Sequence, residues 1–510
     1  MKNFIQRHSN LRIGIQKKFI RIITLLSCLS ILGSCLQQDS DLPLAHQYQP
    51  AELKADLEVF RGSLEDMHPA LFQYLTRAKY DSLIRKVANS LDAPLTAAEF
   101  QSGLAEIVAA IRCGHTKIDL SENQKTQFWQ QAKLFPYDLK LIGDRAYCYA
   151  NMSDHQEINP GDEIISINGH SIPQLMELAD AKISNDGYIQ TRKMRFLERD
   201  FAEFYARYIT QPDTFSIIYK HKNGQTNKTV TASINAAERY SRQTENQLAE
   251  LSDHIALNMI DSLSAAVLTV TSFNNWEKNG SETDFKEELE SSFRQVTNAG
   301  TQHLIIDLRN NGGGDDELGL ALFSHLYGQP ITEFNEMMFR VNKSKYFRYS
   351  DFNGFYRWII ADVLLTTAEA NDTTFYVKDL PTLEASEPAK IQYDGKVYLL
   401  VNGRTFSTAA DVAALLRSYK VAVIIGEETG GGYYGNSSGL DINVTLPASQ
   451  LHLKIPTVQY QTNVRSILPR GRGTIPDVNI SPTITDYLNQ TDTALEYILN
   501  TINKYSDEKA

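Results

Sequence analysis

A serine at the start of a predicted helix is in a position suited to nucleophilic chemistry. The segment from Val397 to Gly432 reads VYLLVNGRTFSTAADVAALLRSYKVAVIIGEETGGG. Its apolar run, its polar turn and the amphipathic pattern after Ser407 predict a strand, a turn and a helix, followed by a second strand. Parallel sheets carry their chemistry where a strand ends and a helix begins. Ser407 is therefore a candidate nucleophile, with the first amides of the helix, including that of Thr408, able to stabilise an oxyanion.

The same serine has a simpler interpretation as a helix cap. Ser and Thr side chains at a helix start accept a backbone N–H bond, and Thr405, Ser407 and Thr408 could each do so. The G-x-S-x-G pattern of a nucleophile elbow does not occur in this segment. Taken alone, the segment favours the cap over the nucleophile.

A second segment carries a run of glycines directly after a buried strand. Residues 304–314 read LIIDLRNNGGG, so the apolar strand ends in Asp307 and Arg309 and continues into three glycines. Glycines after a strand let the backbone turn sharply and present bare N–H groups to an oxyanion or a peptide carbonyl. The alternative is an ordinary glycine-rich turn.

Together, the two segments resemble the C-terminal processing peptidase family of serine peptidases. Its hallmark is a strand ending in DLRxNxGG and a later T-x-S segment that carries the nucleophile, and supporting matches run from about Asp56 to about Asp477. The resemblance implies an acyl-enzyme mechanism on Ser407. It places the oxyanion on backbone N–H groups of Gly312 or Gly313 and of Thr408, and it implies no cofactor.

The resemblance also predicts a histidine as the base. Better-known bacterial members use a lysine in a G-x-x-T-x-G-K loop, but the corresponding loop here, GEETGGG, places Gly432 at the lysine position. In the branch that resembles tricorn protease and the interphotoreceptor retinoid-binding proteins, the base is a histidine in a GHT-like motif. Gly114-His115-Thr116 matches that motif, although tricorn has a serine where Gly114 stands. His115 is the predicted base, with an unperturbed pKa of about 6.5; otherwise it is an exposed loop residue.

The group that orients the histidine is left open by the sequence. A serine-histidine pair works best when a third group holds the ring, as the acid does in a triad. Tricorn supplies a glutamate near its closing element, but the matching position here is Arg470. Glu427 and Glu428 are candidates because they lie beside the glycine loop.

Length and composition limit the classes of protein. A chain of 510 residues is too long for one ordinary core, so two or three domains are expected. The net charge of -11 argues against a nucleic-acid partner. An apolar content of 42% is that of a globular protein.

The N-terminus has the pattern of a bacterial lipoprotein signal. Six basic residues precede an apolar run at 22–32 that is too short to span a bilayer comfortably, and Leu32-Gly33-Ser34-Cys35 resembles a lipobox. We expect a signal peptide at 1–35, lipid attachment at Cys35 and a tether at 36–50. These features predict a cell-envelope protein anchored to a membrane. A plain signal peptide or an uncleaved anchor is the alternative.

Two of the four cysteines remain after the signal region, Cys113 and Cys148. They could form one disulfide in an oxidising compartment, but their spacing does not require it. No C-x-x-C pair indicates a metal, so we expect no structural metal.

The rest of the chain is predicted to be a multidomain α/β protein. A helical region at 51–130 has a helix break at His68-Pro69 and a helix from a capping Thr96 to Ile111. Residues 131–236 resemble a PDZ domain, because Ile158–Ile172 reads INPGDEIISINGHSI with a hairpin turn at Asn168-Gly169. A crotonase-like (ClpP-like) catalytic core is expected at 250–485, with an insertion at 334–391, and a C-terminal helix at 486–510.

Three functions are compatible with these features. The first is an envelope serine endopeptidase whose PDZ-like module binds or gates a peptide. The second is a peptide- or ligand-binding protein that kept the fold and lost turnover, as the missing lysine suggests. The third is a hydrolase of non-peptide esters or glycan-linked peptides. Retention of Ser407 and His115 favours an enzyme over a binding protein, and the PDZ-like module favours peptides as substrates. The sequence leaves the oligomeric state open.

Overall fold

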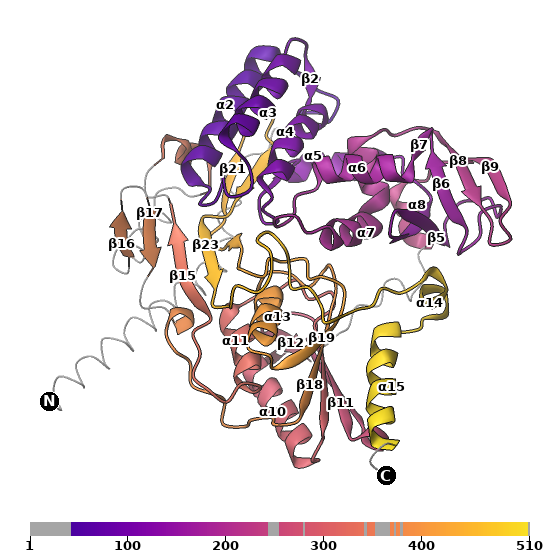
Figure 1. Cartoon of the computed structure of the whole chain (residues 1–510). Coiled ribbons are helices and arrows are strands. Elements are labelled where there is room, and N and C mark those ends of the chain that lie inside the picture. Colours follow the sequence, from indigo (N-terminus) through magenta and orange to yellow (C-terminus); the bar gives the residue numbers. More distant parts are fainter. Residues whose placement is uncertain are drawn as a thin grey trace.

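The computed structural model describes residues 42–242, 254–278, 281–340, 344–351, 368–371, 374–377 and 381–507. The predicted signal peptide, Cys35 and the start of the tether lie outside the described residues. Within the described ranges, no helix is long and apolar enough to cross a membrane. Figure 1 shows a helical region at the top, a strand-rich module at the right and a larger core below them.

The helical region has the helix boundaries that the sequence predicts. Helix α2 ends at Met67, directly before the predicted break at His68-Pro69, and Thr96 caps α4 in a capping box with Glu99. The elements are β1 (Gln47–Tyr48), α2 (Pro50–Met67), α3 (Arg77–Ser90), β2 (Leu95–Thr96), α4 (Ala97–Ile111), β3 (Lys117–Asp119) and α5 (Glu122–Gln131).

The strand-rich module follows, with its strands in the order β4-β5-β6-β8-β9 and β7 paired to β6. The predicted turn at Asn168-Gly169 has φ of 49° and 85°, so both residues adopt the left-handed conformation that a tight hairpin requires. The elements are β4 (Tyr137–Ile142), β5 (Arg145–Asn151), β6 (Glu163–Ile167), β7 (His170–Ser171), α6 (Ile172–Lys182), α7 (Thr191–Tyr208), β8 (Thr214–Lys220), β9 (Thr226–Ala232) and α8 (Ala236–Arg242). Helix α6 is a feature that the sequence analysis missed.

The core is built on a sheet with the order β10-β11-β14-β18-β19-β24, in which every neighbouring pair except β10·β11 is parallel. Its elements are β10 (Ile255–Ile260), β11 (Ala265–Val270), α10 (Phe285–Asn298), β14 (His303–Asp307), α11 (Asp316–Ser324), β18 (Lys396–Val401), α13 (Thr408–Ser418), β19 (Ala422–Gly426) and β24 (Val478–Asn479). The strand containing Leu304–Asp307 therefore lies beside the strand that leads to Ser407.

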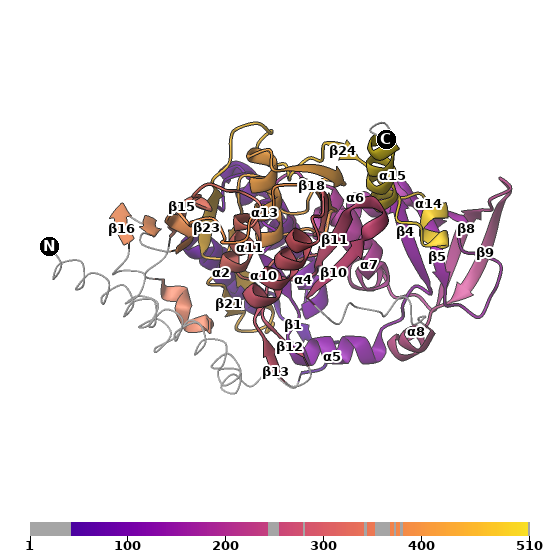
Figure 2. The same cartoon turned by 90° about the horizontal axis from the view of Figure 1, so that it is seen from below.

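Alternate residues of the core strands pack on opposite faces of this sheet. Leu304 and Ile306 face a cluster that includes residues of α10, α11 and α13, whereas Ile305 faces a cluster that includes Ile498 of α15. Helix α15 (Thr493–Asp507) follows α14 (Ile484–Asn489). Figures 1 and 2 both show α15 on the side of the sheet away from α10 and α13. The sheet is thus buried on both faces, as parallel sheets are.

Two strands of the core sequence leave it to join the helical region. Strands β21 (Ile442–Thr445) and β22 (His452–Ile455) pair with each other, and β22 pairs with β3. Figure 1 shows β21 among the indigo helices. A further sheet has the order β16-β17-β15-β23-β20 and includes three strands of the predicted insertion, β15, β16 and β17. Its strands are β15 (Phe334–Phe339), β16 (Ala368–Asn371), β17 (Thr374–Val377), β20 (Ser437–Ser438) and β23 (Val458–Thr462).

Candidate active site

Ser407 occupies the cap position of α13 but does not act as a cap. Its side chain makes no capping hydrogen bond, and its backbone has φ 55° and ψ −134°. An ordinary capping serine has an extended backbone and bonds the third amide of the helix, as Ser171 does before α6. The cap interpretation of Ser407 is therefore wrong. A non-glycine residue in this conformation is strained, and such strain is concentrated at functional sites.

The glycine run packs directly against Ser407. Gly313 has φ +99°, and a Cβ added to it would lie 2.7 Å from Ser407 Cβ and 2.9 Å from the carbonyl oxygen of Phe406. Only a glycine permits both the backbone conformation and this approach. Strands β14 and β18 are parallel neighbours, so their carboxyl ends bring the two segments together at one edge of the sheet.

The three predicted oxyanion donors differ in what their N–H groups do. The N–H of Gly313 donates to Asn311 Oδ1 at 2.8 Å, and Asn311 Nδ2 in turn donates to the Val270 carbonyl at 2.9 Å. Among the described residues, no hydrogen bond uses the N–H of Gly312 or of Thr408. Thr408 is the first residue of α13, where amides have no partner within the helix. Of the three predicted donors, the amides of Gly312 and Thr408 are therefore free within the described ranges.

The side chain of Thr408 fixes the nucleophile helix to the glycine run. Its Oγ1 lies 2.9 Å from the Gly314 carbonyl oxygen and 2.8 Å from Asp316 Oδ1. Burial raises the pKa of Asp316 to about 6. These contacts fix the start of α13 against the start of α11.

His115 lies beside the segment that carries Ser407. It follows the left-handed turn that ends α4, and its ring stacks on Phe406 with the centroids 4.6 Å apart. A Cβ on Gly114 would lie 2.9 Å from Phe406 Cζ, so the glycine of the GHT motif makes room for this ring. The described residues show no hydrogen bond between His115 and Ser407.

The GHT turn is anchored by buried polar contacts. His68, which the sequence predicts to be structural, is fully buried, and its Nε2 lies 3.0 Å from Thr116 Oγ1. This contact fixes the residue directly after His115.

The surroundings of His115 keep its ring neutral. Burial lowers the pKa of His115 to about 3, and repulsion from Arg192, Lys454 and Lys117 acts in the same direction. The neutral imidazole can accept a proton. Its Nδ1 is buried and has no hydrogen-bond partner among the described residues.

A buried aspartate that the sequence analysis missed lies next to His115. Asp186 is 6% exposed, and its Oδ1 accepts a hydrogen bond from the N–H of Gly114 at 2.7 Å. The N–H of Gly187 donates to the Arg112 carbonyl at 3.0 Å, which ties the two turns together. The only signal in the sequence is Asn-Asp-Gly at 185–187, which predicts a turn and nothing more.

Donor atoms of Asp186, His115 and Cys113 converge. One donor atom from each of the three lies within 4.8 Å of the others, and within the described ranges this is the one group that could hold a metal ion. Burial raises the pKa of Asp186, with hydrogen bonds and Arg192 opposing the effect. Its Oδ2 has no hydrogen-bond partner among the described residues.

Glu427 and Glu428 are occupied by arginines. Arg195 Nε donates to Glu427 Oε2 at 2.8 Å, and Arg472 donates to both carboxylate oxygens of Glu428. Glu428 also accepts the N–H of Gly473 at 2.8 Å. The described contacts of these carboxylates therefore hold the glycine loop to α7 and to the closing element, and none of them reaches His115.

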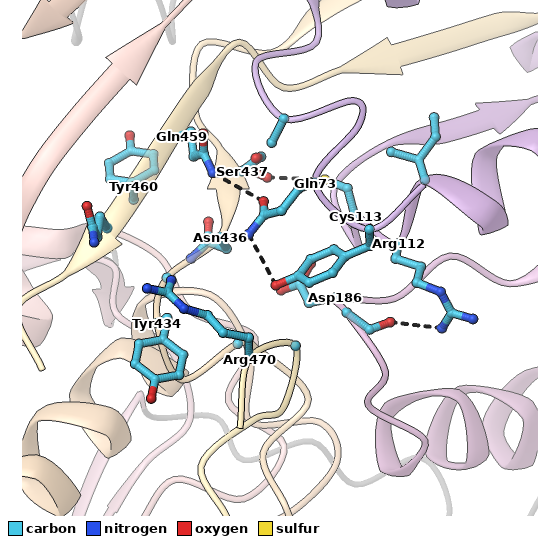
Figure 3. A pocket seen from close by; sticks show the side chains of 18 of the residues that line it. Gln73, Arg112, Cys113, Asp186, Tyr434, Asn436, Ser437, Gln459, Tyr460 and Arg470 are labelled. Carbon is cyan, nitrogen blue, oxygen red and sulfur yellow. Dashed lines mark hydrogen bonds between the residues drawn. The ribbon is translucent and has the colours of Figure 1, made fainter. Parts of the chain in front are cut away.

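A polar cavity of about 170 Å³ is lined by Arg112 and Cys113, the two residues directly before the GHT motif, among others (Figure 3). Figure 3 shows Cys113 and Asp186 on one side of it and Arg470 and Tyr434 on the other. Arg470 stands at the position where tricorn has its glutamate. Its guanidinium stacks on the Tyr434 ring, 4.6 Å from the ring centroid. Both cysteines outside the signal region are buried and unpaired, so Cys113 and Cys148 form no disulfide.

Comparisons with known proteins agree with this fold. Residues 264–480, which include the glycine run and Ser407, match Peptidase family S41. The crystal structure of mature CPAF is similar with a TM-score of 0.61 at 15% identity, covering 89% of this chain and 98% of that one. The complex of mature CPAF with lactacystin has a TM-score of 0.60 at 15% identity, covering 90% of this chain and 99% of that one. A mutant of CPAF has a TM-score of 0.63 at 13% identity, covering 89% of this chain and 97% of that one. No curated protein matches the chain. The core of this chain, residues 264–480, therefore matches Peptidase family S41, and the fold is similar to that of mature CPAF.

Proposed function

We propose that the chain is a serine endopeptidase that uses Ser407 as nucleophile and His115 as general base. The observation that carries this proposal is the strained backbone of Ser407, which has no capping bond and is pressed against Gly313. His115 packs on the residue that precedes the serine. An isolated hydroxyl needs such a base to be a useful nucleophile at neutral pH.

The reaction is an acyl transfer in two halves. Ser407 Oγ forms a bond to the peptide carbonyl carbon as its proton passes to His115, and the carbonyl oxygen becomes an oxyanion. The C–N bond then breaks, and His115 returns the proton to the leaving amine. Water repeats the sequence on the acyl-enzyme, so that the acid product leaves and the serine regains its proton.

The free amides of Gly312 and Thr408 are the proposed oxyanion donors. The N–H of Gly313 is held by Asn311, so Gly313 contributes shape and not a hydrogen bond to the reaction. A preorganised pair of backbone donors stabilises the oxyanion more in such a site than water does, because the donors need not reorganise as charge develops.

Asp186 is the proposed positioning residue for His115. Its carboxylate and the imidazole are buried together, each with one unpartnered polar atom. Catalytic hydrogen bonds are often long in unliganded enzymes and shorten when the substrate binds. Asp186 thus takes the role for which the sequence offered Glu427 and Glu428.

The module at 131–236 and the N-terminal signal extend the proposal. We propose that the module binds or gates peptides in the manner of a PDZ domain, which captures a chain end by strand addition. Deleting the peptide's terminal carboxylate should then weaken binding to the whole chain. We also propose an envelope location through a lipid on Cys35. Cys35→Ala in the full-length protein should abolish fatty-acid labelling and release the protein from membranes.

Cleavage of an unstructured protein such as casein tests the enzymatic proposal. The full chain should digest casein, and Ser407→Ala should abolish digestion while melting at the temperature of the parent. If wild type and Ser407→Ala are equally inactive but both bind peptides, the chain is a binding protein on this fold and the peptidase proposal fails. An esterase would hydrolyse small activated esters and leave casein intact.

A further inference from the structure

We infer that this peptidase selects acidic peptides, holding a substrate carboxylate in a cationic cavity beside His115. The inference rests on the proposed function and adds the substrate class. The cavity has a volume of about 300 Å³. Its lining contains five basic side chains and no acidic one: Lys117, Arg192, Arg199, Arg404 and Lys454.

The five cations are brought together by four separate segments. Lys117 lies on β3, Arg192 and Arg199 on α7, Arg404 in the turn after β18, and Lys454 on β22. The whole chain carries a net charge of -11, so this concentration of positive charge opposes its overall balance. A cavity lined by one sign of charge focuses its field and attracts ligands of the other sign.

The arrangement includes a repulsive pair that stability alone does not explain. Lys117 and Lys454 are direct cross-strand partners on β3 and β22. Like charges at such positions destabilise a sheet. Desolvation in the cavity, together with repulsion from Arg192 and Lys454, lowers the pKa of Lys117. An anionic ligand between the two ammonium groups would relieve this repulsion.

Two of the cations have no carboxylate partner among the described residues. Arg192 is only 6% exposed, and its guanidinium lies 3.3 Å from the centroid of the Phe406 ring. No ion pair of Arg192 or Lys117 occurs within the described ranges, whereas Lys454 pairs with Asp441 at 2.5 Å and Arg199 with Asp200 at 2.6 Å. Of these two, Arg192 is buried, and a buried charge without a carboxylate partner is costly, which favours a carboxylate supplied by the substrate.

The cavity borders the reacting atoms. His115, Gly312 and Phe406 also line it, so it adjoins the proposed base, a proposed oxyanion donor and the residue before Ser407. An extended peptide advances about 3.3 Å per residue, so a side chain in this cavity belongs to a residue within about two positions of the cleaved bond.

A carboxylate in the cavity would also act on the base. Arg192, Lys454 and Lys117 all lower the pKa of His115, while Asp186 and Cys113 each have a donor atom within 4.8 Å of a ring nitrogen of His115. A bound anion offsets the three cations and raises the pKa of His115 toward the working pH, where a general base is most effective. An acidic substrate should therefore increase kcat as well as lower KM.

The test compares matched peptides cleaved by the full chain. In the first set, the peptides differ only in carrying Asp, Asn or Lys within two positions of the cleaved bond. In the second set, the peptides differ only in having the C-terminus as a free acid or as an amide. We expect kcat/KM at low salt to be at least about 10-fold higher for the acidic member, with the ratio shrinking as salt screens the field. The first set reports an acidic side chain and the second a terminal carboxylate. Equal rates across both sets would overturn the inference.

Charge changes in the protein provide the matched controls. Lys117→Gln and Lys117→Glu should reduce the acidic-to-neutral ratio progressively, and the second should favour the Lys peptide. Lys228→Glu makes the same charge change on an exposed residue of β9, in the strand-rich module, and should leave the ratio unchanged. If both glutamate variants lower the ratio equally, net charge and not the cavity sets the preference.

A binding measurement separates this inference from the proposed function. Fluorescence anisotropy with Ser407→Ala and labelled Asp or Asn peptides requires no turnover. Tighter binding of the Asp peptide that is lost in Lys117→Glu supports the cationic cavity even if no peptide is cleaved. Cleavage without any charge preference supports the proposed peptidase function and shows that the cationic cavity does not determine which peptides are cleaved.

Discussion

A carboxylate oxygen of Asp186 lies within 4.8 Å of a ring nitrogen of His115, although the two residues belong to different turns. The N–H of Gly114 donates to Oδ1 of this carboxylate, so the aspartate is held in place by the turn that carries the histidine. Asp186 Oδ2 and His115 Nδ1 are both buried and have no hydrogen-bond partner within the described ranges. Two such groups at this separation are placed to pair when the site contracts on a substrate.

Asp186→Asn should lower kcat by about 10- to 100-fold with little change in KM, because correct orientation of a base is part of the roughly 100- to 10,000-fold that general base catalysis contributes. The acid limb of the pH profile should also shift, which a purely structural role would not cause. Asp162→Asn is the matched control: Asp162 is a buried aspartate 2.9 Å from His221 in the strand-rich module. Equal losses in both variants would contradict the assignment.

Gly313→Ala should reduce kcat/KM by about 100- to 1000-fold, the loss typical of a disturbed oxyanion site. The new Cβ would lie 2.7 Å from Ser407 Cβ and 3.0 Å from Thr408 N, so the nucleophile or its amide must move. Gly224→Ala controls for backbone strain, because Gly224 has φ +90° with nothing within 4 Å of an added Cβ. Activity of Gly313→Ala at the level of Gly224→Ala would show that the contact is unimportant.

The pH dependence of kcat/KM on a neutral peptide should show no inflection at the ordinary histidine pKa. Burial and the cations around His115 lower its pKa to about 3, so the free enzyme keeps its base unprotonated well below pH 6.5. We expect a flat profile between about pH 5 and 8. Lys117→Gln removes one cation and should raise the pKa of His115, moving the acid limb to higher pH. A wild-type inflection near 6.5 would be inconsistent with this environment.

Glu333→Gln should stabilise the protein increasingly as pH rises. Burial and repulsion from Asp316 and Asp411 raise the pKa of Glu333 well above its ordinary value, and neither carboxylate oxygen has a partner among the described residues. The folded state therefore keeps a proton that the unfolded state loses above about pH 4.5. Wild type loses up to about 1.4 kcal/mol per pH unit from this group, whereas glutamine loses nothing.

Thermal melting of both proteins at pH 5 and pH 8 measures this difference. The Tm advantage of Glu333→Gln should be larger at pH 8. Glu336→Gln, on the exposed side of β15, should show no such growth. A Tm difference that is the same at both pH values would refute the assignment of a protonated Glu333.

Most of the fold was predictable because its elements are set by local patterns. The capping box at Thr96 and Glu99 predicted the start of α4 to the residue, and the Asn168-Gly169 turn predicted the hairpin between β6 and β7. The pairing of β22 with β3 could not be predicted in this way. It joins strands from opposite ends of the chain, and strand alternation specifies a buried face but not the neighbour.

The candidate site could be proposed from the sequence where it follows a linear motif and not where it depends on packing. Ser407, His115 and the glycine run stand in recognisable segments. Asp186 does not, because it is placed by a backbone hydrogen bond from Gly114 that no spacing reveals. The proximity of Glu427 and Glu428 to the glycine loop was a poor guide, since both carboxylates were already paired with arginines.

Covalent labelling by a fluorophosphonate probe tests the central claim most directly. The purified protein should be labelled in a single position, and the label should be absent from Ser407→Ala and strongly reduced in His115→Ala. Ser171→Ala, which removes an ordinary helix-capping serine, should label like wild type. Wild type that remains unlabelled, or labelling that persists in Ser407→Ala, would show that Ser407 is not an activated nucleophile.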